Sequence, residues 1–146
     1  MFFGISCETT NQSEELKIGD RKSFQVISDM KGRVYPSNDS ASYYSFKAVA
    51  NYLEAHPEWV FEIGVHTDHR GDSVANLKLS EWRAIMACQV FHETFEIESE
   101  RMVAKGYGEG DPVFSEEKIR GIQTTKEKEL AHQRNRRYEI TVLRRY

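Results

Sequence analysis

Cysteine and long apolar runs are both scarce in this sequence, and their scarcity excludes several classes of protein. The chain has 2 cysteines, Cys7 and Cys88. They are too few and too far apart to form a disulfide framework or a zinc site, and they do not fix the redox compartment. No apolar run approaches the roughly 18 residues that a membrane-spanning helix needs. We therefore expect neither a disulfide-stapled scaffold nor a transmembrane helix.

A large excess of charge of one sign is missing as well. The 20 Lys+Arg and 23 Asp+Glu give a formal net charge of -3. No overall electrostatic field therefore attracts nucleic acid or an anionic membrane. The 146 residues, 39% of them hydrophobic, are enough to close one core and too few for two. We expect one globular domain.

The N-terminal segment "FFGISCETTNQSEELKIG" places Cys7 after small or apolar residues and before a polar stretch. This order is typical of the end of a bacterial lipoprotein signal, which makes Cys7 a candidate lipidation site. A frayed N-terminus is the alternative, because the apolar part is short and Gly4 stands where a leucine is usual. We interpret residues 1–19 as a tether and residues 20–146 as the domain.

Hydrophobic spacing predicts alternating strands and helices in that domain. The predicted strands cover residues 22–29, 59–66, 101–112 and 136–143. The predicted helices cover residues 43–55 and 80–95, with Ser80 as the N-cap of the second, and a further helix starts at a Thr125 cap. The order β-α-β-α-β-β predicts an α+β fold in which helices cover one face of a mixed sheet.

The stretch "HTDHRGDSVANLKLSEWRA" ends the second predicted strand and starts the second predicted helix. Asp68 lies at the carboxyl end of the strand, where ligands usually bind in such sheets. If Ser80 caps the helix, Arg83 lies near its third position, where a cation opposes the helix dipole at about 0.3 to 1 kcal/mol. A residue that breaks a local rule is a hint of function.

Asp68 and Arg83 can therefore converge at one end of the sheet. With the free N–H groups of the helix, they would offer an acceptor for an ammonium group and donors for a carboxylate. That combination suits a zwitterionic amino acid. An internal Asp68–Arg83 salt bridge is the alternative, and the spacing leaves both hypotheses open.

Metal binding and nucleophilic catalysis are the competing uses of this stretch. In an alternating strand, His66 and Asp68 share a face while His69 points away, and no matching ligand motif follows. Ser80 is better explained as a cap, and Cys88 as a core residue. We expect no metal, no cofactor and no catalytic residue.

The C-terminus is rich in arginine. Nucleic-acid binding is disfavoured, because "EEKIRGIQTTKEKE" just upstream carries as many acids as bases. A solvated strand end is the simpler interpretation. Arg136 would share a strand face with Tyr138, which directs it toward the pocket at the strand ends, where a buried arginine needs a partner. The arginines concerned are Arg134, Arg136, Arg137, Arg144 and Arg145.

Three ordered motifs between Val60 and Leu143 resemble a known family. "HTDHRG…N…LSEWRA", "RMVAKGYGEGDP" and "NRRYEI" are similar to the OmpA-like C-terminal domain of OmpA, Pal and MotB proteins. The resemblance implies a βαβαββ two-layer sandwich. It also implies non-covalent binding of peptidoglycan through the diaminopimelate of the stem peptide, without enzymatic activity. Such a domain would anchor an outer-membrane protein or lipoprotein to the wall from the periplasm.

The resemblance assigns roles to five residues. Asp68 of "TD" and Arg83 of "LSEWRA" match the family's acid and base, which diaminopimelate would meet with its amino group and carboxylate. Thr67, Asn76 and Arg136 of "NRR" would complete the ligand pocket. Asn135 is expected to order the adjacent loop instead.

The sequence departs from the family pattern in three places. Val65 replaces the usual glycine before "HTD", and "FQVISDM" only loosely meets the first strand motif. The segment 114–133 is longer than in many members and would cover the pocket or contact a partner. A protein–protein adaptor that keeps the fold without wall binding is therefore the alternative function.

Overall fold

The computed structural model describes residues 15–26 and 41–146. The strands are β1 (Arg21–Phe24), β2 (Trp59–His66), β3 (Met102–Gly108) and β4 (Tyr138–Arg145). The helices are α1 (Ala41–Glu54), α2 (Ser73–Phe95), α3 (Glu116–Arg120) and α4 (Thr125–Asn135), with a short 3-10 helix at Ser99–Arg101. In this described part of the chain, no helix has both the length and the apolarity needed to cross a membrane.

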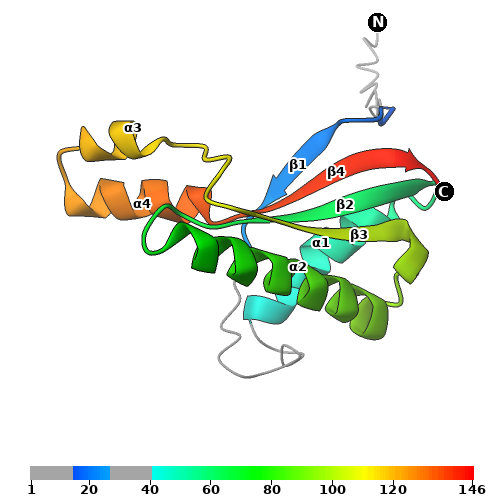
Figure 1. Ribbon diagram of the computed structural model, residues 1–146. Helices are drawn as coiled ribbons and strands as arrows, with labels where there is room; N and C mark the ends of the chain where they lie inside the picture. Colours follow the sequence, from blue (N-terminus) through cyan, green and yellow to red (C-terminus); the bar gives the residue numbers. More distant parts are fainter. Residues whose placement is uncertain (1–14, 27–40) are drawn as a thin grey trace, which may run out of the picture.

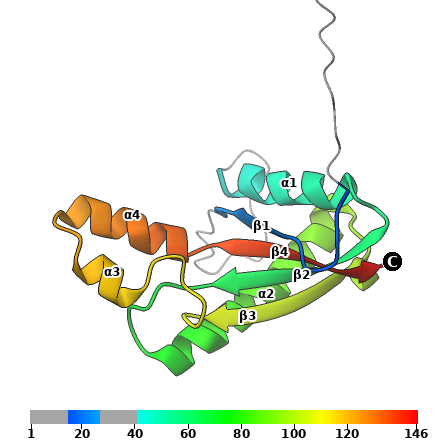
Figure 2. The ribbon, with the colours of Figure 1, turned by 90° about the horizontal axis from the view of Figure 1, so that it is seen from above.

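The four strands form one mixed sheet in the order β1-β4-β2-β3, which Figure 2 shows from above. β2 and β3 are parallel and are joined through α2, whereas β4 runs antiparallel to both β2 and β1. The parallel pair needs a helical crossover, and α2 supplies it. The predicted α+β class and the βαβαββ order are confirmed, with α3 and α4 as additional helices between β3 and β4.

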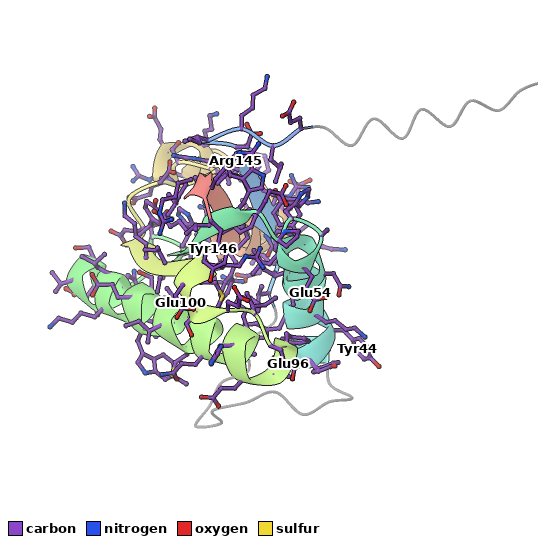
Figure 3. All side chains as sticks on the ribbon, turned by 90° about the vertical axis from the view of Figure 1, so that its right-hand side faces the viewer. Tyr44, Glu54, Glu96, Glu100, Arg145 and Tyr146 are labelled. Carbon is purple, nitrogen blue, oxygen red and sulfur yellow. The ribbon has the colours of Figure 1, made fainter. Side chains whose placement is uncertain are left out.

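α1 and α2 cover one face of the sheet and enclose the core with it (Figure 1, Figure 3). Phe46 of α1 lies at the centre, with its ring 5.6 Å from that of Phe91 and 6.0 Å from that of Tyr138. The stripe predicted for the first helix is fully buried, as the apolar spacing requires. Its members are Phe46, Val49, Ala50 and Leu53.

β2 is buried along its whole length, although its sequence predicts simple alternation. Ile63 and Val65 face the core as expected. On the opposite side, the Tyr107 hydroxyl donates to the Glu62 carboxylate, and the Tyr107 ring stacks on His66 at 4.6 Å. β2 is thus shielded from water on both faces, by the core on one side and by this polar layer on the other, while β3 and β4 cover its edges.

α2 begins well before the position that the sequence predicts. Gly71 has a φ of +91°, which turns the chain, and the Asp72 carboxylate then accepts from the backbone N–H of Ala75 at 2.8 Å. The predicted N-cap at Ser80 is therefore wrong. Asp72 is an equally good cap, and the intervening "SVANLKL" contains no helix breaker, so the helix starts at Ser73.

Ser80 joins α2 to β3 instead of capping the helix. Its hydroxyl donates to the carbonyl of Leu77 and accepts from the N–H of Gly108, both at 2.8 Å. The approach of helix and strand is close here, since a Cβ on Gly106 would lie 2.6 Å from the Cα of Glu81. The helix and its neighbouring strand are therefore fixed at a glycine-dependent distance.

The 114–133 segment forms a helical hairpin at one end of the sheet, drawn at the left of Figure 1. Ser115 caps α3 by accepting from the N–H of Lys118. Thr124, rather than the predicted Thr125, caps α4 by accepting from the N–H of Glu127 at 3.2 Å. Both threonines are good caps, and the turn between the helices selects the first.

The N-terminal predictions lie mostly outside the described residues. Cys7 is one of these, as are residues 27–29 of the first predicted strand, which in the described part ends at Phe24. Leu16 packs against the core, and the N–H of Gly19 donates to the carbonyl of Val142 at 2.8 Å. The division into a tether and a domain stays a prediction.

Candidate functional site

A cavity of about 320 Å³ opens where β2 and α4 end and β4 begins. Among the described residues, three arginines line it, from α2 and from the junction of α4 and β4, and no acidic residue does. It therefore favours an anionic group on whatever enters it. The lining residues are Gln25, Val26, Val65, His66, Arg83, Gln133, Arg136, Arg137 and Tyr138.

Asp68 lies just past the end of β2 and is held by two arginines. Its Oδ2 accepts from Arg136 Nη1 at 2.6 Å and from Arg70 Nη2 at 2.9 Å, and its Oδ1 accepts from the backbone N–H of Arg70 at 3.0 Å. Burial alone would raise the pKa of Asp68, but these hydrogen bonds lower it to about 2. The carboxylate is therefore ionised throughout the neutral range.

Glu129 of α4 completes a cluster of four charges with Asp68, Arg70 and Arg136. It accepts from Arg70 Nη1 and from Arg136 Nη2, each at 3.0 Å, and these hydrogen bonds lower its pKa. The two carboxylates and the two guanidinium groups cancel, so this cluster has no net charge. The inserted hairpin is thereby tied to the loop that follows β2.

Arg136 supports this cluster from the end of α4 and not from a strand. β4 begins only at Tyr138, and Arg136 is the C-cap residue of α4. The prediction of a strand position for Arg136 is therefore wrong. Its placement beside the strand-end pocket is confirmed, and its partner there is Asp68.

Arg83 lies in the third turn of α2, so its predicted place in the first turn is wrong. The predicted unfavourable interaction with the helix dipole is wrong as well, because the dipole acts mainly on the first and last turns. Its side chain is half-buried and lines the cavity. Among residues 15–26 and 41–146, it has no hydrogen bond or ion pair. The alternative of an internal Asp68–Arg83 salt bridge is wrong, because Asp68 pairs with Arg70 and Arg136.

Thr67 and Asn76 flank Asp68 and order its loop. The N–H of Thr67 donates to the carbonyl of Gly108 at 2.9 Å, while its buried hydroxyl lacks a hydrogen-bond partner in the described structure. The Asn76 amide donates to the carbonyl of Arg70 at 3.1 Å and to Glu109 Oε2 at 3.0 Å. The structure brings both residues to the site, whereas their predicted contacts with a ligand stay predictions.

Asn135 orders the loop that leaves β3, as predicted. It is fully buried, and its amide accepts from the N–H of Phe114 at 2.9 Å and donates to the carbonyl of Phe114 at 2.8 Å. These two bonds replace a backbone pair. Asn135 therefore fixes the base of the hairpin rather than the wall of the cavity.

The histidines of "HTDH" lie in different environments. His66 stacks on Tyr107, and burial, with a contribution from Arg137, lowers its pKa to about 4. His69 instead contacts His132 of α4, with ring centroids 5.0 Å apart. Within the described residues, no group of three or more His, Cys, Asp or Glu side chains is arranged to hold a metal ion.

Sequence reasoning missed Arg70 and Glu129. Arg70 could have been found, because it follows Asp68 by two residues in a turn. Glu129 could not, since it is 59 residues from Arg70 and lies in a polar helix whose position depends on the tertiary fold.

The chain matches known proteins along much of its length. The family model described as "OmpA family" matches residues 39–126, which is more than half of the chain. Outer membrane porin F of Pseudomonas aeruginosa is 36% identical over 72 residues, and Photosystem I P700 chlorophyll a apoprotein A2 of Gloeobacter violaceus is 44% identical over 81 residues. These stretches cover 49% and 56% of this chain, but only 21% and 9% of those longer proteins.

Solved structures share the fold at low identity. The peptidoglycan-associated lipoprotein from Burkholderia pseudomallei superposes with a TM-score of 0.56 at 22% identity, over 82% of this chain and 88% of that chain. The periplasmic domain of Helicobacter pylori MotB superposes with a TM-score of 0.60 at 14% identity, over 89% of this chain and 86% of the other. The family match and the shared fold lead to one conclusion: the chain belongs to the OmpA family.

Proposed function

We propose that this domain binds peptidoglycan non-covalently, through the diaminopimelate residue of the stem peptide, and is a binding module rather than an enzyme. The observation that carries the proposal is the position of Arg83, which lines the cavity without a partner in the described part of the chain. The ionised Asp68 lies beside the cavity, where it accepts a hydrogen bond from the lining residue Arg136. A cation in the cavity and an anion beside its wall suit the carboxylate and the ammonium group of one zwitterionic ligand.

The relatives support the same proposal. One similar structure is described as a peptidoglycan-associated lipoprotein, and another similar protein as an outer membrane porin. By this analogy, the domain works in the periplasm and anchors an outer-membrane protein or lipoprotein to the cell wall. Lipidation of Cys7 and the role of residues 1–19 as a tether belong to the same proposal.

Calorimetry with a diaminopimelate-containing muropeptide tests the site. We expect Asp68→Ala and Arg83→Ala each to weaken binding by about 2 to 5 kcal/mol, since each leaves one charge of the ligand without a partner. Glu116→Ala and Arg120→Ala are the matched controls, because they remove an exposed ion pair on α3. Unchanged affinity in both site variants would exclude this site.

A protein–protein adaptor is the second candidate, and the hairpin of α3 and α4 favours it. A cavity of about 210 Å³ beside α4 is lined by Phe114, Ile122 and Leu130, among others, and Leu130 is 50% exposed. Pull-down on purified sacculi discriminates the two functions. Retention of the wild type and its loss in Arg83→Ala would support wall binding, whereas no retention of the wild type would favour the adaptor.

A further inference from the structure

The carboxylate of Asp68 is already occupied by groups of this chain. A carboxylate offers about four lone-pair positions, and Asp68 uses three of them, for the N–H and Nη2 of Arg70 and for Nη1 of Arg136. An ammonium group can donate three hydrogen bonds, but Asp68 offers it only the one remaining position. A ligand ammonium group can therefore form more than one hydrogen bond with Asp68 only by displacing a guanidinium group.

Arg70 is the partner that can be displaced at lower cost. Its side chain is 49% exposed, against 37% for Arg136, so that water can solvate its guanidinium group once it leaves Asp68. Arg70 also lies in the loop between β2 and α2, beside Gly71 with its φ of +91°, whereas Arg136 is fixed between α4 and β4. Exchange at Asp68 should thus involve Arg70.

Glu129 gives the displaced Arg70 a second partner. It accepts from Arg70 Nη1 at 3.0 Å, a different nitrogen from the Nη2 that donates to Asp68. Arg70 therefore stays close to Asp68 after it releases the carboxylate. A competitor that is tethered in this way acts at a high effective concentration.

We infer that Arg70 sets the affinity of this site by competing with the ligand ammonium group for Asp68, an inference that rests on the proposed function. The competition lowers the affinity for every ligand that binds Asp68 through an ammonium group. An amine without a carboxylate therefore binds too weakly to be held. Only a ligand whose carboxylate also contacts Arg83 overcomes it. Arg70 thereby lowers the affinity for both kinds of ligand, and the contact with Arg83 decides which of them is still bound.

Two probes test this competition in NMR chemical-shift titrations of the full chain. Free meso-diaminopimelate carries both groups, and cadaverine is the corresponding diamine without carboxylates. We expect Arg70→Gln to raise the affinity for both probes by about tenfold, the factor that one charge-assisted hydrogen bond is worth. A merely structural role of Arg70 predicts the opposite sign, because loss of loop order would weaken binding.

Controls separate competition from simple loss of positive charge. Arg120→Gln removes an exposed arginine of α3 that does not contact Asp68, and should leave both affinities unchanged. The gain should persist at about 0.3 M salt, where exposed charges are largely screened. In the Asp68→Asn background, Arg70→Gln should have no effect, because the competition acts through that carboxylate.

The outcomes distinguish the inference from the function on which it rests. If the wild type binds diaminopimelate and Arg70→Gln binds it equally or more weakly, the inference fails and the proposed function stands. If neither protein binds diaminopimelate, the proposed function fails. A gain of equal size in the Asp68→Asn background would also overturn the inference.

Discussion

Arg136 Nη1 donates to Asp68 Oδ2 at 2.6 Å across 68 residues of sequence. Asp68 follows β2, whereas Arg136 connects α4 to β4, so this bond joins the end of the sheet to the inserted hairpin. A double-mutant cycle with Asp68→Asn and Arg136→Gln should give a coupling energy of about 1 to 2 kcal/mol in urea unfolding. The value is moderate because Arg136 remains partly exposed. Additive single effects would show that the bond does not stabilise the fold.

Ser80 and Asp72 should differ in how their removal affects stability. Asp72→Ala removes the N-cap of α2 and should cost about 1 kcal/mol in the free energy of unfolding. Ser80→Ala should cost about 1 to 3 kcal/mol, because it leaves the buried N–H of Gly108 without an acceptor. Urea denaturation of both variants measures these costs, with exposed Ser73→Ala as the control. A neutral Ser80→Ala would contradict a structural role for that hydroxyl.

Gly106→Ala should destabilise the fold by about 3 kcal/mol or more, because the added Cβ falls on the backbone of α2 at Glu81. Backbone atoms cannot rotate away as a flexible side chain can, so α2 must move from β3. Gly121→Ala is the matched control, since its Cβ would meet no atom closer than 3.5 Å. Thermal unfolding followed by circular dichroism compares the two, and equal melting temperatures would refute the close approach.

His66 should make stability fall on acidification. Burial, with Arg137, lowers its pKa from 6.5 to about 4, so the unfolded chain binds a proton more readily than the folded chain between these values. Stability therefore rises with pH across this window, and acidification from pH 6.5 to 4 should remove on the order of 3 kcal/mol. His66→Phe keeps a ring against Tyr107 and removes the proton site.

Urea unfolding of wild type and His66→Phe at several pH values isolates this contribution, because both proteins share every other titrating group. The difference in unfolding free energy between them should change with pH between 6.5 and 4 and be constant above that window. A constant difference over the whole range would show that His66 does not titrate as a buried group.

The element order followed from patterns that local physics controls. The apolar stripe of α1 and the apolar run of β2 match their observed bounds closely, since both elements are defined by burial on a regular period. The start of α2 was missed because Asp72 and Ser80 are both good caps, and sequence does not rank two acceptable caps. α3 was missed because its 5 residues carry too little periodicity.

The sequence by itself determined the family, the strand and helix order and the presence of Asp68 and Arg83 near one end of the sheet. The element order and the placement of Asp68 and Arg83 depend on residue type and on spacing within about 15 residues, where helix and strand geometry fixes what can meet. The family depends on three motifs in a fixed order along the chain. Only the tertiary structure decided which charges pair: Asp68 with Arg70 and Arg136, and Glu129 with both arginines. Ion pairs form between whichever side chains the packed backbone brings within reach, and that distance is absent from the chain order.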